Sequence, residues 1–243
     1  MKRPLDQEKV VAIVPAAGIG KRFGPGTNKP FNSLGGKPLI VWSLKTLESI
    51  GKIEEVIPVL KVEDMVQGEK IFKDFKLSKI KRIAAGGKER QDSVYNGLKL
   101  IKEGNCIVLI HDGVRPLIEK HLIEGLINHM LKILRDKEDC DGVALGIPLK
   151  DTIKEAENGM IKKTLNRDKL WAIQTPQVFS YKNILASYKK AMKESFYSTD
   201  DTALVERYGG KIKVVMGSYK NIKITTPEDM YTAEALLKMN SKP

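Results

Sequence analysis

A run of small residues followed by positive charge is the part of this sequence best suited to chemistry. Residues 15–23 read PAAGIGKRF, and such small side chains let the backbone pass close to a ligand and point N–H groups at it. Lys21, Arg22 and Lys29 crowd the same stretch, and cations there can neutralise a polyphosphate. The segment therefore predicts a phosphate-binding loop. A glycine-rich turn that serves only tight packing is the alternative.

The loop matches neither of the two most familiar phosphate-binding patterns. A dinucleotide fingerprint requires a glycine where Phe23 stands. A Walker A loop requires a glycine and a hydroxyl residue where Pro15 and Arg22 stand. Phosphate binding of another kind is therefore expected.

Composition and charge restrict the class of protein. The 243 residues include 42 Lys and Arg against 30 Asp and Glu, a formal net charge of +12. These cations are scattered among acidic residues and form no zinc-finger, basic-zipper or RNP1 string, which favours anionic small substrates over nucleic acid. With two cysteines, no apolar run of roughly 18 residues and the start MKRPLDQEK, we expect a cytoplasmic protein without disulfides or a membrane span.

Short β-prone runs alternate with amphipathic stretches along the chain. The expected strands lie at residues 10–14, 55–60, 79–84, 106–110, 142–147 and 212–216. Between them apolar residues recur at near-helical spacing, and one helix is expected to start near Asp92. The pattern predicts a single domain over residues 1–243 with an α/β, Rossmann-like fold, in which a mainly parallel sheet carries helices on both faces.

Residues 148–168 differ from the rest in their polarity. Two β-prone pieces, DTIKEA and MIKKTLNR, flank Asn158 and Gly159, and Asn-Gly between extended runs is a strong hairpin signal. The segment has too few large apolar residues to form core. It therefore predicts a projecting β-hairpin arm.

Seven motifs stand in order along nearly the whole chain. They are PAAGIGKRF with Lys29, GGKERQDSV at 86–94, HDGVRP at 111–116, LKDTIK at 149–154, NRDKLWAIQTPQVF at 166–179, TDDTALVE at 199–206 and NIKITTPEDM at 221–230. Together they resemble the 2-C-methyl-D-erythritol 4-phosphate cytidylyltransferase family. The resemblance implies a homodimeric nucleotidyltransferase of isoprenoid precursor biosynthesis, which uses CTP and Mg²⁺ and releases diphosphate.

The resemblance also implies roles for individual residues. Charge on the reacting phosphates would be stabilised by four cations, Arg22, Lys29, Arg167 and Lys223. CTP would lie against Pro15, Ala16, Ala17, Gly18, Gly20, Gly87, Lys88, Ser93, Asp112 and Gly113. The polyol phosphate would contact Arg115, Thr152, Arg167, Thr175, Lys223 and Thr225. Thr152 and Arg167 would come from the partner subunit, which fits the predicted arm.

Several of these positions have a plainer interpretation or depart from the family pattern. Asp112 is a candidate Mg²⁺ ligand, with a turn-forming aspartate as the alternative, although the triphosphate would hold most of the ion. Ser93 can be a helix cap, and His111 is expected to be a hydrogen-bonded structural residue. Lys88 stands where relatives commonly have an acidic residue, and in Asn28-Lys29-Pro30 the proline follows the lysine instead of preceding it.

Two competing functions remain open at this point. A related cytidylyltransferase acting on ribitol 5-phosphate would share the fold and the chemistry, but PAAG instead of an LAGG-type start favours the erythritol enzyme. A catalytically silent, basic regulatory or nucleic-acid-binding domain would also share the scaffold. The presence of all four predicted catalytic cations argues against it.

Overall fold

The centre of the molecule is a seven-stranded sheet. The computed structural model describes residues 8–18, 23, 28–102 and 106–240. The strand order is β11-β7-β10-β6-β1-β4-β5. The bounds are β1 (Val10–Pro15), β4 (Ile53–Leu60), β5 (Ala84–Ala85), β6 (Ile107–Ile110), β7 (Gly142–Pro148), β10 (Trp171–Ser180) and β11 (Ile212–Met216).

All neighbouring strands are parallel except where β10 pairs with β6 and β7. The mainly parallel sheet is therefore confirmed. The antiparallel strand β10 was not predicted, because Pro176 lacks the N–H that a central strand needs. The structure accommodates it with a register shift against β7 between Ile173 and Gln177.

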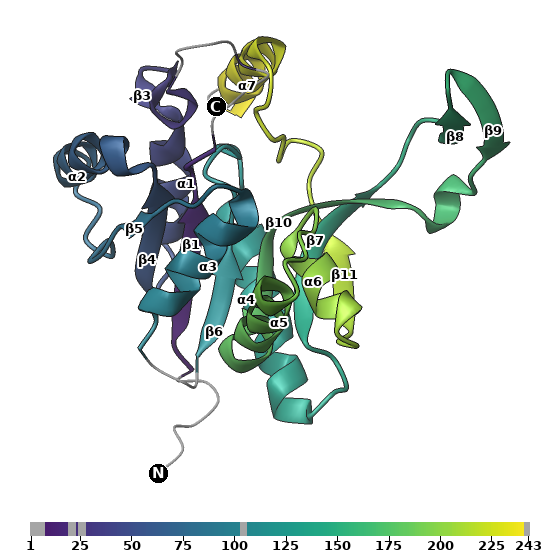
Figure 1. The fold of residues 1–243 in the computed structure, drawn as a ribbon. Coiled ribbons are helices and arrows are strands. Elements are labelled where there is room, and N and C mark those ends of the chain that lie inside the picture. The colour runs from purple at the N-terminus through teal and green to yellow at the C-terminus, as the bar shows by residue number, and fades with distance from the viewer. Residues whose placement is uncertain (1–7, 19–22, 24–27, 103–105, 241–243) are drawn as a thin grey trace.

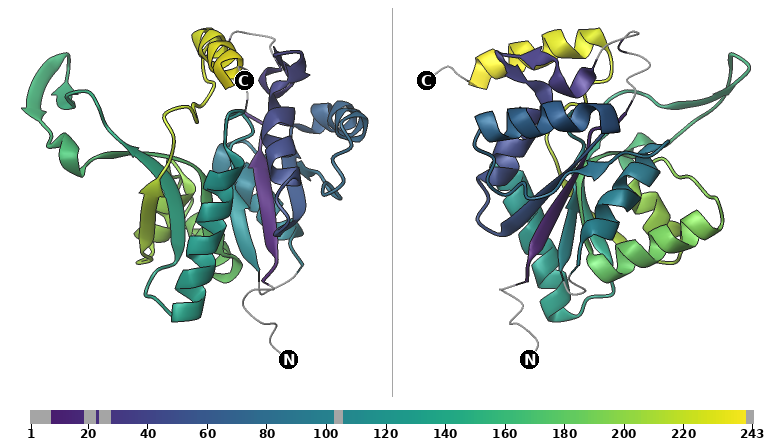
Figure 2. Two further views of the ribbon diagram at one scale, coloured as in Figure 1. Left: turned by 180° about the vertical axis from the view of Figure 1, so that it is seen from behind. Right: turned by 60° about the vertical axis from the view of Figure 1, so that its left-hand side comes forward.

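Helices cover both faces of the sheet, as predicted (Figures 1 and 2). One face packs against α1 (Leu39–Glu48), α2 (Met65–Asp74) and α4 (Lys120–Asp136). The other packs against α3 (Arg90–Leu100), α5 (Tyr181–Lys193) and α6 (Asp201–Arg207). Strand β1 supplies both cores in alternation, with Ala12 in the first and Val11 and Ile13 in the second.

A third apolar cluster closes one end of the sheet. Helix α7 (Pro227–Asn240) packs there against the small hairpin of β2 (Ser33–Leu34) and β3 (Lys37–Pro38). In the described part of the chain, 3-10 turns lie at Lys29–Phe31, Val62–Asp64 and Arg167–Lys169. The first of them carries the predicted catalytic Lys29.

The hairpin arm is present and projects from the body of the molecule (Figure 1). It consists of β8 (Lys154–Glu157) and β9 (Met160–Thr164), which pair antiparallel and are exposed throughout. Asn158 and Gly159 adopt φ angles of 50° and 79°, the left-handed conformation of a two-residue hairpin turn. The hairpin prediction is confirmed.

Most strand boundaries lie within two residues of the prediction, and two differences have a clear physical cause. The strand expected at 79–84 is reduced to β5, and Arg82 ties the preceding stretch to β4 through an ion pair with Glu55 at 2.7 Å. Helix α3 begins at Arg90 instead of Asp92, because Glu89 and Asp92 form a reciprocal capping box. Among the described helices, none is long and apolar enough to cross a membrane.

Gly142 at the start of β7 allows a close approach that any larger residue would prevent. A Cβ there would lie 2.5 Å from Phe179 and 2.9 Å from the carbonyl of Val178. We expect Gly142→Ala to lower the free energy of unfolding by about 1–3 kcal/mol, measured by urea denaturation. Gly125→Ala in α4, where a Cβ meets nothing within 4 Å, should be neutral or stabilising by up to about 1 kcal/mol. Equal stability of the two variants would contradict this account.

Candidate active site

The loops that follow β1 and β5 meet at the carboxyl edge of the sheet, where α/β folds place ligands. The N–H of Ala16 donates to Val59 O at 2.8 Å, and that of Gly86 donates to Leu60 O at 2.7 Å. A Cβ at Gly86 would lie 2.2 Å from the Cβ of Ala17, so only glycine fits. The structure thus brings two of the predicted CTP-binding segments together.

The turn after β6 packs against the first loop. The N–H of Gly113 donates to Pro15 O at 3.2 Å, and a Cβ at Gly113 would lie 3.2 Å from that of Ala16. Pro15 and Gly113 are buried, whereas Gly18 is exposed at the end of the described part of the loop. Gly20 and Arg22 lie outside the described residues.

Ser93 orders the loop between β5 and α3. Its buried hydroxyl accepts a hydrogen bond from the N–H of Gly87 at 3.0 Å and donates to Glu89 O at 3.1 Å. Glu89 is the N-cap of α3, so Ser93 is not the cap residue. Gly87 and Lys88 are exposed, which leaves the loop open to a ligand.

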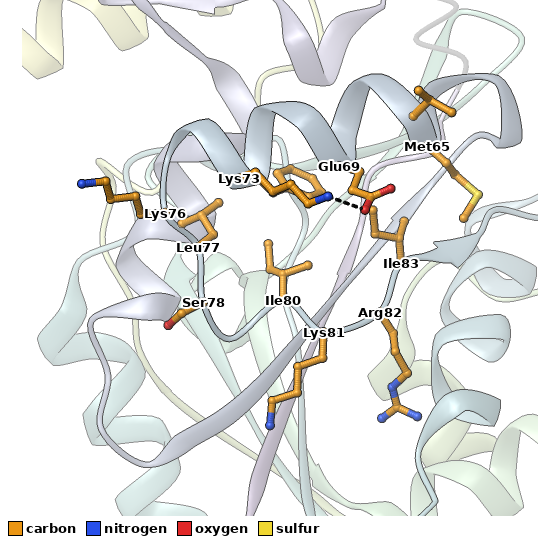
Figure 3. A pocket seen from close by; sticks show the side chains of 12 residues that line it. Met65, Glu69, Lys73, Lys76, Leu77, Ser78, Ile80, Lys81, Arg82 and Ile83 are labelled. Carbon is orange, nitrogen blue, oxygen red and sulfur yellow. Dashed lines mark ion pairs between the residues drawn. The ribbon is translucent and has the colours of Figure 1, made fainter.

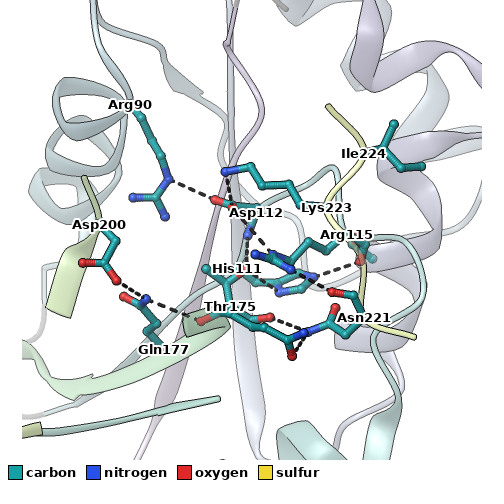
Figure 4. Close-up of polar contacts among 12 residues, drawn as sticks. Arg90, His111, Asp112, Arg115, Thr175, Gln177, Asp200, Asn221, Lys223 and Ile224 are labelled. Carbon is teal, nitrogen blue, oxygen red and sulfur yellow. Dashed lines mark hydrogen bonds and ion pairs between the residues drawn. The ribbon is translucent and has the colours of Figure 1, made fainter. Parts of the chain in front are cut away.

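Asp112, directly after β6, lies among three cations (Figure 4). Its carboxylate accepts from Arg90 Nε at 2.9 Å and from Lys223 Nζ at 2.8 Å, with Arg115 Nε at 3.8 Å. Burial alone would raise the pKa of Asp112, but the surrounding cations outweigh it and hold that pKa well below its usual range. The carboxylate therefore stays ionised.

His111 and Thr175 form a buried chain of hydrogen bonds beneath this carboxylate. The N–H of Asp112 donates to Thr175 Oγ1 at 3.0 Å, and Thr175 Oγ1 lies 3.2 Å from His111 Nδ1. His111 Nε2 lies 3.2 Å from Arg115 O, which only accepts, so the proton belongs on Nε2 and Thr175 donates to Nδ1. Burial lowers the pKa of His111 to about 4, which keeps it neutral. This geometry favours the interpretation of His111 as a hydrogen-bonded structural residue.

Lys29 and Lys223 converge on one segment. Lys29 Nζ donates to Ile224 O at 3.2 Å, and the N–H of Ile224 donates to Val114 O at 2.9 Å. The Lys223 side chain remains 40% exposed, so its ammonium can also meet a ligand. Two predicted catalytic cations, far apart in sequence, thus lie at the same edge of the sheet.

The sequence analysis missed a second ion pair, in which Asp201 is fully buried and the Arg90 side chain is 28% exposed. Arg90 donates to both carboxylate oxygens of Asp201 at 3.0 and 2.8 Å, and Tyr188 donates to the same carboxylate. Burial opposes the charge, but Asp201 and Asp112 raise the pKa of Arg90 well above its usual value. Both partners stand in quoted motifs, but pairing across 111 positions leaves no sequence signal. Arg90 thereby connects Asp112 to α6.

Other predicted acceptor contacts are engaged elsewhere. Thr225 donates through its N–H and hydroxyl to Asp229 at 2.7 and 2.9 Å, in the turn before α7. Thr152 and Arg167 are exposed at the base of the arm, where Arg167 Nη1 donates to Lys150 O at 2.6 Å. Within this chain the arm residues do not join the Asp112 cluster.

The donor set does not fit a metal held by the protein alone. Within the described part of the chain, no three His, Cys, Asp or Glu side chains gather in a metal-binding group. Both oxygens of Asp112 already bind cations, so a metal there would have to displace Arg90 or Lys223. The arrangement instead suits a polyanion, whose charge Lys29 and Lys223 can stabilise.

The neutral, buried His111 makes stability depend on pH. Its pKa is about 4 in the folded protein and about 6.5 in an unfolded chain, so the unfolded state gains the proton first as pH falls. We expect the free energy of unfolding to drop by roughly 1 kcal/mol between pH 7.5 and 5.5, and by more towards pH 4, in urea titrations.

The dependence should disappear in His111→Asn and persist when the exposed His121 and His129 are both changed to Gln. A slope that follows the two exposed histidines instead would refute the assignment.

Comparison with known proteins agrees with this geometry. A family model described as 2-C-methyl-D-erythritol 4-phosphate cytidylyltransferase (IspD) matches residues 10–239. The protein of that name from Syntrophus aciditrophicus is 44% identical over 233 residues, which cover 95% of this chain and 96% of the relative. The one from Clostridioides difficile is 43% identical over 231 residues, or 95% and 94% of the two chains.

Solved structures of the same kind share the fold. The crystal structure of 4-diphosphocytidyl-2C-methyl-D-erythritol synthase from Anaerococcus prevotii superposes with a TM-score of 0.83 at 35% identity, covering 96% of this chain and 98% of that one. Family model, relatives and structure agree over nearly the whole length. The chain therefore belongs to the 2-C-methyl-D-erythritol 4-phosphate cytidylyltransferase family.

Proposed function

We infer that this protein transfers the cytidylyl group of CTP to 2-C-methyl-D-erythritol 4-phosphate and releases diphosphate, a step of isoprenoid precursor biosynthesis. Family membership supports the two substrates, and the cations gathered around Asp112 at the meeting point of the loops support the chemistry. An oxygen of the acceptor phosphate attacks the α-phosphorus of CTP as the bond to the β-phosphate breaks. The acceptor phosphate is already a nucleophile at neutral pH, so no general base is needed.

The reacting phosphates are assigned to the cations whose side chains are at least partly exposed. Lys29 and Lys223 stabilise the charge that develops on them, and Arg22 is proposed for the same role. Arg115 and Thr175 are almost fully buried and hydrogen-bonded within the protein, so we assign them the positioning of Asp112 and of residues 221–224. Cytosine and ribose are assigned to the exposed loop at Gly87 and Lys88 and to the backbone of Ala16 and Ala17.

Mg²⁺ is proposed to enter with CTP. The triphosphate would supply most of its ligands, because this ion keeps several waters and takes few protein carboxylates. Its contribution would be to neutralise phosphate charge. Asp112 stays with its cations in this proposal.

A homodimer is proposed to complete the site. Trp171, Ile173, Val214 and Met216 are exposed, and the first three surround Gly146 on one sheet face at the base of the arm. A contiguous apolar patch on a sheet face favours a protein partner. A second copy seated there would bring its arm, with Thr152 and Arg167, to the first copy.

A cytoplasmic location is proposed because CTP is made and used there.

The acceptor assignment has a direct test. With Mg²⁺ present, we expect diphosphate release from CTP with 2-C-methyl-D-erythritol 4-phosphate and little or none without an acceptor, because the acceptor phosphate is the nucleophile. Diphosphate is measured by a coupled enzymatic assay. Equal or faster release with ribitol 5-phosphate would favour the related enzyme, and no release with either would favour a silent domain.

The shared site has a test based on mixed dimers. Lys29→Ala and Arg167→Ala should each lower kcat by about 10²- to 10³-fold, because each removes a cation from developing charge. If the two residues serve one site from different chains, a mixed dimer has one doubly damaged site and one intact site. Random exchange of equal amounts makes about half the dimers mixed, so roughly a quarter of wild-type activity should return.

Subunit exchange is verified independently, for example by mass spectrometry of differently labelled chains. No recovery after verified exchange would refute the shared site. A monomer at assay concentration would do so as well.

A further inference from the structure

A cavity of about 700 Å³ lies between α2 and residues 76–83 (Figure 3), and none of its lining residues belongs to the Asp112 cluster. Its apolar lining comes from both sides of the gap. Leu77, Ile80 and Ile83 point towards the helix, which contributes Met65 and Phe72. Val66 at the rim is 81% exposed. Cavities of about 300–1,000 Å³ with mostly apolar walls are typical of small-molecule sites.

The polar part of the lining is strongly basic. Four cations, Lys73, Lys76, Lys81 and Arg82, stand against Glu69 alone. Glu69 is paired with Lys73, and Arg82 is paired with Glu55 outside the cavity. Lys76 and Lys81 are exposed and form no ion pair with any described residue. Their long stems can bring an ammonium to the rim from either side of the segment.

Helix α2, the upper wall of the cavity, is fastened to the segment that carries Lys29. Asn28 Nδ2 donates to the buried Asp64, at the start of the helix, at 2.5 Å. Gly68, on the inner side of α2, packs closely against Leu60, from which an added Cβ would lie 2.4 Å, and Phe31 is at ordinary contact distance from the same point, 3.6 Å. Movement of α2 therefore moves the backbone on either side of Lys29.

The lower wall continues directly into the proposed nucleotide loop. Ile83 is followed by β5 and then by Gly86, which is held by Leu60 O and packed against Ala17. The two walls of the cavity are thus connected to both loops. A ligand that spreads its walls would displace both.

We propose that this cavity binds a small amphipathic anion, with the apolar body between α2 and residues 76–83 and the anionic group at the lysine rim, and that its occupancy weakens CTP binding. The positive charge of the lining indicates an anionic ligand. Three exposed lysines, Lys73, Lys76 and Lys81, border the apolar cavity, and its one carboxylate, Glu69, is already paired with Lys73. The proposal goes beyond the transferase reaction and requires only that the chain bind CTP.

Binding is tested with straight-chain carboxylates on the full-length protein by isothermal titration calorimetry. From hexanoate to octanoate to decanoate, affinity should rise roughly two- to fourfold per methylene, as apolar burial predicts. Decanol, which lacks the charge, should bind more weakly than decanoate. No measurable decanoate binding at millimolar concentration, or affinity independent of chain length, would overturn the proposal.

The site is located with two variants of equal net charge. The first replaces the rim lysines Lys73, Lys76 and Lys81 with glutamine, which removes the charge and keeps a polar side chain only one atom shorter. The control replaces three exposed lysines of α5, on the opposite face of the sheet, at Lys182, Lys189 and Lys193. The rim variant should bind decanoate roughly tenfold more weakly and decanol unchanged, and the control should match wild type. Equal decanoate affinity in both variants would place the anion elsewhere and refute the site.

The coupling is tested by measuring the dissociation constant of CTP, without acceptor, with and without saturating decanoate. We expect it to rise by about fivefold in wild type, and saturating CTP should weaken decanoate by the same factor. The rim variant should require correspondingly more decanoate for the same effect.

A CTP dissociation constant that stays the same or falls would refute the coupling. Complete exclusion of decanoate by CTP in every variant would also refute it, because it would show simple competition at the nucleotide site. CTP turnover without any carboxylate tests the transferase function separately.

Discussion

The charge of one buried carboxylate holds the working end of this molecule together. Asp112 is 5% exposed, and a carboxylate in such a place is stable only if cations surround it. Its partners come from the start of α3, from the turn after β6 and from residues 221–224, and Arg90 extends the network to α6. Loss of every partner would leave an uncompensated buried charge, which typically costs about 3–5 kcal/mol, and loss of one partner weakens that compensation. Stability and site geometry therefore depend on the same contacts.

The antiparallel strand β10 explains how Lys223 reaches that carboxylate. Where its register shifts, Gln174 turns to the segment after β11, donates to Ser218 O at 2.9 Å and accepts from Asn221 at 3.2 Å. Asn221 also donates to the carbonyl of Thr175 at 2.9 Å, while its own carbonyl accepts from Arg115 at 2.7 Å. An irregular stretch of strand thus positions the loop that carries a catalytic candidate. In a regular strand the carbonyl of Thr175 would instead be available to the backbone ladder.

The same features show what the sequence could and could not predict. Apolar runs such as residues 10–14 and 142–147 define strands because burial on both faces requires them, and Asn158-Gly159 defines a turn because few residues accept its φ angles. Strand β10 was not predicted because Pro176 is unusual in a central strand. The stretch before β5 lies beside β4 and is joined to it by the ion pair of Arg82 with Glu55 and a hydrogen bond from the N–H of Val56 to Lys79 O, without a regular ladder. The pairing of Arg90 with Asp201 depends on how distant elements pack, which no local pattern encodes. Residue types at the site were predictable, but their partners were not.

The cluster around Asp112 contains more cations than carboxylates. Three cations surround Asp112, namely Arg90, Arg115 and Lys223. Among the described ion pairs of these cations, Asp201 supplies the second carboxylate. Lys29 donates to the carbonyl of Ile224, the residue after Lys223. Asp112 and Asp201 neutralise most of the charge of Arg90 and Arg115. The Lys223 side chain, although paired with Asp112, remains 40% exposed, and Lys29 is only partly buried. These two ammonium groups are held by the fold before any substrate arrives, so they need little reorganisation when phosphate charge develops. A site built in this way can promote phosphoryl-type transfer without a titrating acid or base, which is consistent with the burial and neutrality of its only histidine, His111.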